Sequence, residues 1–107
     1  MQRVTLVRYT AKPDRAGENE ALSRAVFAEL RAKTPGHIGY ALFRDGADFL
    51  HLFVNLRDED AGLLTDLDSF KAFGKDSQDR WVAPPEVSRF NMQLVDSYGF
   101  EAAMAAA

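Results

Sequence analysis

His51 is the residue in this sequence that is best suited to act as a general base. It interrupts an apolar run between Leu50 and Leu52, and an imidazole can exchange a proton with a bound molecule near neutral pH. The alternative is a structural histidine that forms hydrogen bonds across a subunit interface. The other histidine, His37, should lie ~16 Å away along the sheet at ~3.3 Å per residue. We therefore expect no two-histidine site within the chain and assign no metal.

The segment around His51 also contains side chains that could bind an aromatic substrate. Phe49, Phe53 and Asn55 lie an even number of positions from His51, and alternate residues of a strand share a face. Tyr40 should join them from the neighbouring strand. Tyr40 and Asn55 could orient a ring hydroxyl while the phenylalanines contact the ring. Equally, the two polar residues could be satisfied across a hydrated subunit interface.

Arg8 and Trp81 are further candidates, and each has a structural alternative. Arg8 could stabilise a substrate phenolate or enolate through a charge-assisted hydrogen bond, or it could pair with a carboxylate. Trp81 could line the mouth of a pocket, or it could pack in the core next to Ala83-Pro84-Pro85. The acidic run Asp58-Glu59-Asp60 suits a helix start, where carboxylates interact favourably with the helix dipole, better than a cation site.

The elements that position these residues follow from the spacing of apolar side chains. Alternating and β-branched residues predict strands over 3–10, 37–44, 49–56 and 87–98. Leu22, Val26 and Leu30 recur every fourth residue and predict an amphipathic helix over 16–34, ended by Pro35 and a positive φ at Gly36. Acidic residues suit a short helix over 58–65, and Asp68 or Ser69 can cap another that runs to about Trp81.

The order β-α-β-β-α-β predicts a ferredoxin-like α+β fold. In that fold a four-stranded antiparallel sheet carries both helices on one face. The predicted strand 49–56 is apolar on one face and largely aromatic on the other, which predicts that something covers the second face as well. A second copy of the chain is the simplest cover, because twofold dimers are the commonest oligomers.

A turn at Gly46 and Ala47 sets the register of the predicted hairpin. It would place Phe49, His51, Phe53 and Asn55 opposite Arg44, Leu42, Tyr40 and Ile38. The other face would pair Leu50, Leu52 and Val54 with Phe43, Ala41 and Gly39, whose small members would let a helix approach closely. We therefore assign the leucine face to the helices and the His51 face to the partner of a homodimer.

Composition narrows the classes of function. The chain has 107 residues, no cysteine and a net charge of -3, so disulfides and thiolate chemistry are excluded and nucleic acid is not an expected partner. We expect one domain over 1–100 and an alanine-rich tail over 101–107. The start shows no signal-peptide pattern, and no apolar run approaches the ~20 residues that span a membrane. We therefore expect a cytoplasmic protein with no membrane partner.

Several short motifs resemble those of the antibiotic biosynthesis monooxygenase (ABM)-like domains. They occur in the family's order and cover nearly the whole chain: Pro35-Gly36-His37-Ile38-Gly39-Tyr40, Ser69-Phe70-Lys71-Ala72-Phe73 and Pro84-Pro85-Glu86-Val87. The resemblance implies a dimeric α/β barrel in which two sheets pack face to face. Members of the family differ in function: some oxidise phenolic polyketides or quinols without a cofactor, some degrade haem, and many have no assigned activity. The fold alone does not choose among these functions.

The haem-degrading branch relies on an Asn, a Trp and a His. The corresponding positions here are Val7, Leu64 and Gly74, which differ in type, so we do not expect haem degradation. An RNA-recognition module of the same topology would need a basic strand with exposed aromatic residues, and residues 49–56 contain no lysine or arginine.

Two functions then remain open, and with them the question of whether the protein is an enzyme. The first is an ABM-type monooxygenase that oxidises an aromatic or quinol-like small molecule without a cofactor, with His51 as the base. The second is a non-catalytic dimeric module that binds small molecules or has a regulatory role.

Overall fold

The structure, a computed structural model, describes residues 2–57 and 62–99. Its elements in chain order are β1 (Arg3–Thr10), the 3-10 turn η1 (Pro13–Arg15), α1 (Ala16–Lys33), β2 (Ile38–Asp45), β3 (Asp48–Asn55), α2 (Asp68–Lys75), α3 (Ser77–Arg80) and β4 (Glu86–Phe90). The strands form one antiparallel sheet in the order β2-β3-β1-β4. The predicted ferredoxin-like α+β fold is therefore confirmed.

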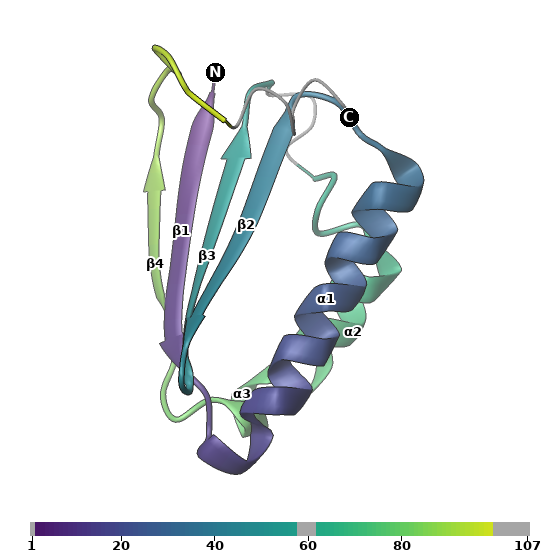
Figure 1. Cartoon of the computed structure of the whole chain (residues 1–107), viewed down its shortest axis with the longest axis vertical. Helices are drawn as coiled ribbons and strands as arrows, with labels where there is room; N and C mark the ends of the chain where they lie inside the picture. Colours follow the sequence, from purple (N-terminus) through teal and green to yellow (C-terminus); the bar gives the residue numbers. More distant parts are fainter. Residues whose placement is uncertain (1, 58–61, 100–107) are drawn as a thin grey trace.

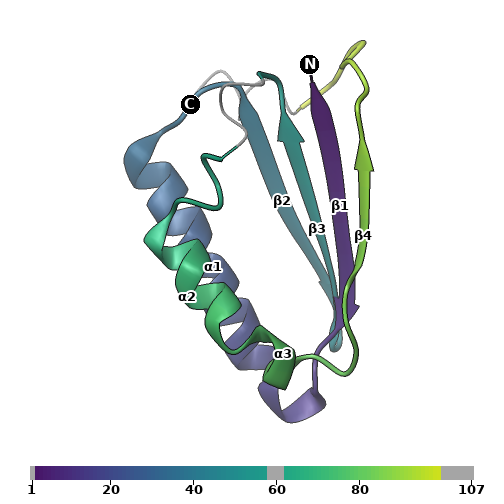
Figure 2. The same ribbon diagram turned by 180° about the vertical axis from the view of Figure 1, so that it is seen from behind.

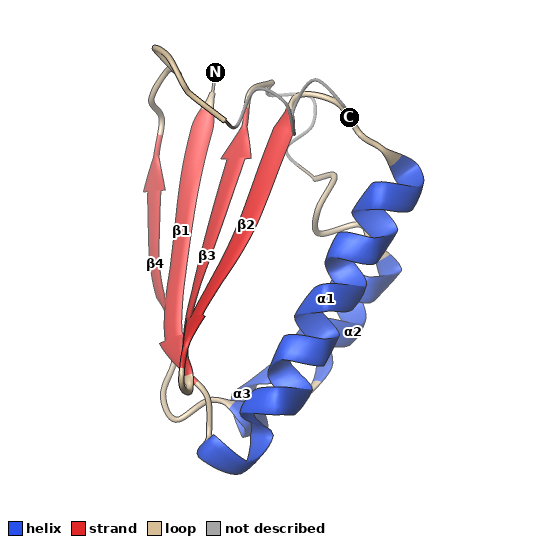
Figure 3. Cartoon of the chain, in the orientation of Figure 1, coloured by secondary structure: helices blue, strands red, loops and turns tan. Residues whose placement is uncertain are grey.

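The helices form one layer on one face of the sheet (Figure 1, Figure 3). The two layers approach each other at the end where β2 turns into β3, and they separate toward the opposite end, as the view from behind also shows (Figure 2). Glu29 on α1 joins the two long helices, because its carboxylate accepts hydrogen bonds from the backbone N–H and the hydroxyl of Ser69 at the start of α2.

The predicted hairpin register is confirmed, but the assignment of its faces is wrong. Leu42 lies opposite His51 and Ile38 opposite Asn55, around a turn in which Gly46 has a φ of 61°. The His51 face nevertheless points toward the helices: the ring centroid of Tyr40 lies 4.6 Å from that of Phe27 on α1, and that of His51 lies 5.8 Å from that of Phe73 on α2.

The physical reason for this reversal lies in the polar tips of the aromatic side chains. Tyr9 and His51 need hydrogen-bond partners when they are buried, and α1 supplies one in Asn19. The opposite face consists largely of aliphatic side chains, which need no such partner. Small residues such as Gly39 and Ala41 therefore did not decide which face the helices cover.

Most of the sheet face opposite the helices is apolar, apart from polar residues such as Arg8, Glu86 and Ser88, and no described element lies over it (Figure 2). The strand pairing places on this face Val4, Leu6, Gly39, Ala41, Phe43, Leu50, Leu52, Val54 and Phe90. We call these nine residues the outer face. Phe43 on the edge strand β2 is 52% exposed and Phe90 on the other edge strand, β4, is 39% exposed, so large apolar side chains at both edges of this face are open to solvent.

Several predicted boundaries are wrong. The last strand ends at Phe90 and not at Tyr98, because Phe90 pairs with Val4 and β1 begins only one residue earlier. The predicted last helix is broken at Asp76 into α2 and α3. The positive φ angles after α1 occur at Thr34 and His37 and not at Gly36.

The predicted helix over 58–65 is tested only in part, because residues 58–61 are outside the described residues. Residues 62–66 form turns instead of a helix. The predicted tail over 101–107 is also outside the described residues.

Candidate functional site

A cavity of about 290 Å³ lies between the sheet and the helical layer. From the sheet it is lined by Arg3, Thr5, Val7, Tyr9, Tyr40, His51, Phe53, Asn55 and Arg89. From the other side it is lined by Leu64, Thr65, Phe70, Phe73 and Trp81. Its size is close to the lower end of the range for small-molecule sites, and its walls are mainly apolar with a few polar groups, as is common for such sites.

The cavity contains most of the candidate residues that the sequence pointed to. Tyr40, His51, Phe53, Asn55 and Trp81 all line it. The four strand residues lie together because the confirmed register of β2 and β3 places them on one face of the sheet. They share that face whether the helices or a partner cover it.

Two candidates lie elsewhere. Phe49 is 1% exposed and belongs to the hydrophobic core, where its ring stacks on Tyr9 with centroids 5.5 Å apart. Arg8 lies on the opposite face of the sheet, across from Leu50 and Glu86. The structure therefore does not bring Arg8 to the cavity that contains His51.

His51 is held between two tyrosine hydroxyls. The hydroxyl oxygen of Tyr9 lies 2.8 Å from Nε2, and that of Tyr40 lies 2.7 Å from Nδ1. Both ring nitrogens are thus engaged by protein groups, and the side chain as a whole is 6% exposed. A molecule in the cavity can exchange a proton with His51 only through one of the tyrosines.

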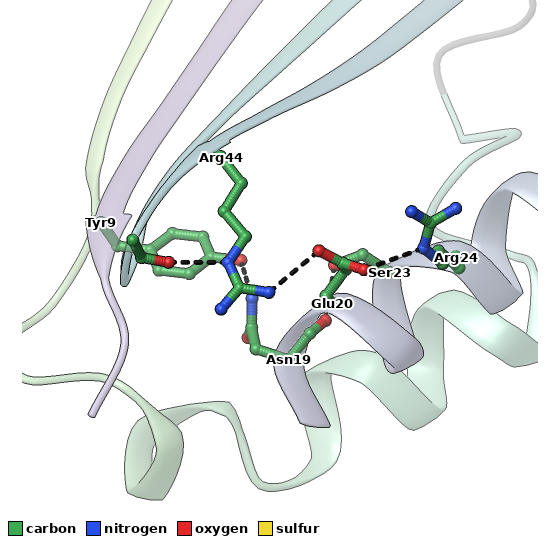
Figure 4. A network of polar contacts seen from close by, with 7 residues as sticks. Tyr9, Asn19, Glu20, Ser23, Arg24 and Arg44 are labelled. Atoms are coloured by element: carbon green, nitrogen blue, oxygen red, sulfur yellow. Dashed lines mark hydrogen bonds and ion pairs between the residues drawn. The ribbon is translucent and has the colours of Figure 1, made fainter. Parts of the chain in front are cut away.

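Asn19 extends this chain of hydrogen bonds into α1. Its amide Nδ2 donates to the Tyr9 hydroxyl at 2.7 Å, and its Oδ1 accepts from Arg80 Nε and from Trp81 Nε1, both at 3.2 Å. Figure 4 shows Tyr9 reaching from the sheet to Asn19, with Ser23 on the same helix. Ser23 Oγ donates to the Asn19 carbonyl oxygen at 2.8 Å.

Arg80 anchors the far end of the same chain. It is fully buried, its Nη2 donates to the Phe73 carbonyl oxygen at 2.5 Å, and its guanidinium carbon lies 5.0 Å from the centre of the Phe73 ring. Removing a guanidinium from water costs free energy, and these hydrogen bonds offset that cost and fix the position of the side chain.

Sequence reasoning missed Tyr9, Asn19 and Arg80. A signal for Asn19 does exist: it lies three and seven positions before Leu22 and Val26, so it belongs to the stripe that faces the sheet. A polar residue in that stripe needs a buried partner. No comparable signal points to Tyr9 or Arg80, because their roles depend on contacts between distant segments.

A second link between sheet and helix lies beside Asn19. Arg44 of β2 reaches Glu20 on α1 with an Nη1–Oε1 distance of 2.9 Å, and Glu20 also pairs with Arg24 at 3.0 Å (Figure 4). Arg44 also lies over the Phe49 ring, with its guanidinium carbon 5.4 Å from the ring centre. These surface contacts join β2 to α1, and none of the three charged residues lines the cavity.

Burial keeps His51, Tyr40 and Tyr9 uncharged at neutral pH. Desolvation lowers the pKa of His51 to about 4, so its imidazole is neutral at pH 7. Desolvation also raises the pKa of Tyr40 and that of Tyr9, although the hydrogen bond from Asn19 and the charge of Arg80 oppose the rise at Tyr9. The neutral ring of His51 therefore carries one hydrogen at neutral pH.

Among residues 2–57 and 62–99, no group of three or more His, Asp or Glu side chains is arranged to hold a metal ion. No helix in the same part of the chain is both long and apolar enough to cross a membrane.

Comparison with known proteins gives matches of structure and not of sequence. No family model matches the chain, and no curated protein is similar in sequence. Rv0793 from Mycobacterium tuberculosis superposes with a TM-score of 0.77 at 15% identity, covering 91% of this chain and 100% of Rv0793. A crystal structure of an antibiotic biosynthesis monooxygenase superposes with a TM-score of 0.71 at 15% identity, covering 88% and 100%.

A third structure is the "putative antibiotic biosynthesis monooxygenase" from Caulobacter crescentus CB15. It superposes with a TM-score of 0.74 at 18% identity and covers 87% of this chain and 91% of that one. The chain has the ABM-like fold. Because the chains match along nearly their whole lengths, the likeness extends over the sheet and the helices that enclose the cavity. At these identities the ABM likeness establishes the fold and leaves activity to be argued from the site.

Proposed function

We propose that this protein is an ABM-type monooxygenase that oxidises an aromatic or quinol-like small molecule without a cofactor. The observation that carries the proposal is the cavity itself: Phe53, Phe70 and Phe73 line a space of about 290 Å³ into which the Tyr40–His51 pair also opens. Had the aromatic side chains filled this space, a purely structural role would have been favoured. The ABM-like fold of the structural neighbours supports the same proposal.

The proposed reaction needs no electron source besides its substrate. The substrate binds as an anion whose activated ring methylene has given a proton to solvent, with the charge shared between that carbon and a ring oxygen. The carbon reacts with dioxygen to form a C–O bond, and the resulting peroxide takes a proton back before its O–O bond breaks. The methylene becomes a carbonyl, and the second oxygen atom leaves as water. The protein would stabilise the charged oxygen and keep water away from the intermediate.

The role of His51 in this reaction differs from that of a free base. Because Tyr9 and Tyr40 occupy its ring nitrogens, His51 acts on the substrate through Tyr40. The Tyr40 hydroxyl then becomes the group that contacts the reacting molecule.

Oxygen uptake with a panel of hydroquinones and anthrones tests the proposal. We expect turnover by the wild type and a roughly hundredfold lower kcat/KM in Tyr40→Phe, as for other donors to a developing oxyanion. Tyr98→Phe is the matched control, since Tyr98 is 99% exposed. Ligand binding without oxygen uptake would instead support the non-catalytic binding module.

We further propose that the protein is a homodimer and that the outer face is its interface, as in a dimeric α/β barrel. The support is the exposed apolar surface opposite the helices, which includes Phe43 and Phe90. This assignment replaces the His51 face, which the helices cover. A cytoplasmic location and the absence of a cofactor stay predictions from the sequence.

A further inference from the structure

The hydrogen bonds from Arg80 to Tyr40 form a chain whose direction can be worked out from its fixed end. Arginine Nε and tryptophan Nε1 can only donate hydrogen bonds. Both lie 3.2 Å from the same side-chain atom of Asn19, so that atom must be the amide oxygen. The orientation of the Asn19 amide is therefore set by two obligate donors.

With the oxygen of Asn19 so placed, its NH₂ group faces Tyr9. The distance from Nδ2 to the Tyr9 hydroxyl oxygen is 2.7 Å, so this oxygen accepts a hydrogen bond. Tyr9 then has its own hydrogen to donate, and of the two side chains that bond its hydroxyl oxygen at 2.7 and 2.8 Å, Asn19 and His51, only His51 can accept it. Tyr9 therefore donates to Nε2 of His51 at 2.8 Å.

A neutral imidazole has one nitrogen that accepts and one that donates. Burial lowers the pKa of His51 to about 4, so the ring is neutral at pH 7. Because Nε2 accepts from Tyr9, the hydrogen must reside on Nδ1, which donates to the hydroxyl oxygen of Tyr40 at 2.7 Å. Tyr40 therefore does not donate its hydroxyl hydrogen to His51. Because Tyr40 lines the cavity, it can donate this hydrogen to a molecule bound there.

We propose that Asn19 and Arg80 act as positioning residues that set the tautomer of His51 and so make Tyr40 a hydrogen-bond donor to the molecule in the cavity. The ligand would be an aromatic molecule that presents an acceptor oxygen, either a carbonyl or a phenolate. This inference rests on the proposed function only in taking the cavity as a site for a small aromatic molecule.

The other polar groups of the cavity favour the same class of ligand. Asn55 Oδ1 accepts the backbone N–H of Arg57 at 3.0 Å, so its NH₂ group is the part of the amide that is left to bond elsewhere. Arg3 and Arg89 also line the cavity, whereas no Asp or Glu among the described residues does. A lining that has several donors and no carboxylate favours an electron-rich or anionic oxygen.

The tautomer of His51 tests the proposal directly. In ¹⁵N-labelled wild-type protein at pH 7, long-range ¹H–¹⁵N correlations distinguish a protonated Nδ1 from a protonated Nε2. We expect the hydrogen of His51 on Nδ1, and His37, which is exposed, serves as the internal reference. Finding the hydrogen on Nε2 would overturn the proposal, and this measurement requires no variant.

Asn19→Asp should reverse the donor–acceptor direction of the hydrogen bonds that join Tyr9, His51 and Tyr40. An aspartate offers acceptors to Arg80, Trp81 and Tyr9 at once, so Tyr9 would donate to it, His51 would donate from Nε2, and Tyr40 would donate to Nδ1. We expect the hydrogen of His51 to move to Nε2. Ser23→Ala is the matched control, because the Ser23 hydroxyl donates to the Asn19 backbone carbonyl and does not orient the Asn19 amide, so its loss should leave the hydrogen on Nδ1. An unchanged tautomer in a folded Asn19→Asp protein would count against the proposal.

Binding of 4-nitrophenol supplies a second readout, because its phenolate absorbs at longer wavelength than the phenol. Wild type should bind the phenolate about tenfold or more tightly than Asn19→Asp does, as expected for one hydrogen bond to a charged oxygen. Equal affinity of the two proteins for the phenolate would overturn the assignment of Tyr40 as donor. The expected tautomer and phenolate preference without oxygen uptake would refute the monooxygenase proposal and leave this inference intact.

Discussion

The two faces of the sheet differ in what their side chains need when they are buried. The inner face, which is the face that packs against the helices, carries aromatic side chains with polar tips. Tyr9 and His51 bond each other there, and Tyr9 also bonds Asn19 on α1. The outer face carries mainly aliphatic side chains such as Leu6 and Leu52, for which contact with any apolar surface suffices. The polar groups of the inner face therefore need hydrogen-bond partners at defined positions, which produces a site. The side chains of the outer face need only to be buried against another apolar surface.

The largest expected effect comes from placing a charge on the outer face. Leu52→Glu puts two carboxylates into the proposed twofold interface, where burying like charges is costly. We expect the dimer dissociation constant to rise about a thousandfold, equivalent to ~4 kcal/mol, as measured by sedimentation. Ala28→Glu, on the exposed side of α1, is the control. A wild type that is monomeric at micromolar concentration would remove the interface altogether.

On the inner side, Arg80→Met should lower the free energy of unfolding by about 3 kcal/mol, because buried acceptors on Asn19 and Phe73 lose a charged donor. Urea denaturation measures the change. The matched control is Arg24→Met, since the Arg24 side chain is 75% exposed and pairs with Glu20 on the surface, so its loss should cost about 0.5 kcal/mol or less. Equal losses in the two variants would mean that the chain of buried hydrogen bonds adds nothing to stability.

The stability of the inner face should also depend on pH. Burial lowers the pKa of His51 to about 4, below the ordinary 6.5 that applies when the chain is unfolded. As pH falls from 6.5 toward 4, the unfolded state binds a proton that the folded state does not, so stability falls. We expect a loss of about 2 kcal/mol between pH 7 and pH 4.5.

Variants assign this pH dependence to His51. Unfolding of His51→Gln should be nearly independent of pH in that window, whereas His37→Gln should behave like the wild type. The window stops at pH 4.5 because below it the unfolded chain increasingly takes up a proton at Glu29, whose folded-state pKa is lowered to about 2 chiefly by its hydrogen bonds to Ser69, so that Glu29 adds its own loss of stability. A His51→Gln protein that keeps the full pH dependence would show that another group titrates.

The smallest effect on stability is expected for Tyr40→Phe. Nδ1 of His51 loses one neutral hydrogen-bond partner at the edge of the cavity, so unfolding should become easier by about 1 kcal/mol. Thermal unfolding of Tyr40→Phe and Tyr98→Phe gives the comparison. A loss as large as that in Arg80→Met would mean that Tyr40 is chiefly structural.

Much of the fold could be predicted from local patterns. The spacing of Leu22, Val26 and Leu30 predicted α1, and the turn at Gly46 predicted the pairing of Leu42 with His51, which the structure confirms. Alternation along a strand separates its two faces, but it does not say which face meets the helices. The assignment of Leu50, Leu52 and Val54 to the helices was wrong for that reason.

The site was predicted to the extent that it depends on one hairpin. Tyr40, His51, Phe53 and Asn55 come together through the β2–β3 register alone. Arg8 was placed with them by residue type, and only the β1–β3 register, which is set by distant pairing, shows that it lies opposite Leu50 on the other face. Asn19 and Arg80 could not be paired from spacing, because their contact joins segments 61 residues apart.

That separation has a consequence for the order in which the protein is completed during synthesis. The first 55 residues contain β1, α1, β2 and β3, which can close by connections along the chain that are short enough to form early. The donors that orient the Asn19 amide, however, come from Arg80 and Trp81, 61 and 62 positions later. Under the proposed assignment, a nascent chain can therefore build most of its sheet before the groups that orient Asn19, and with it the tautomer of His51, have been synthesised.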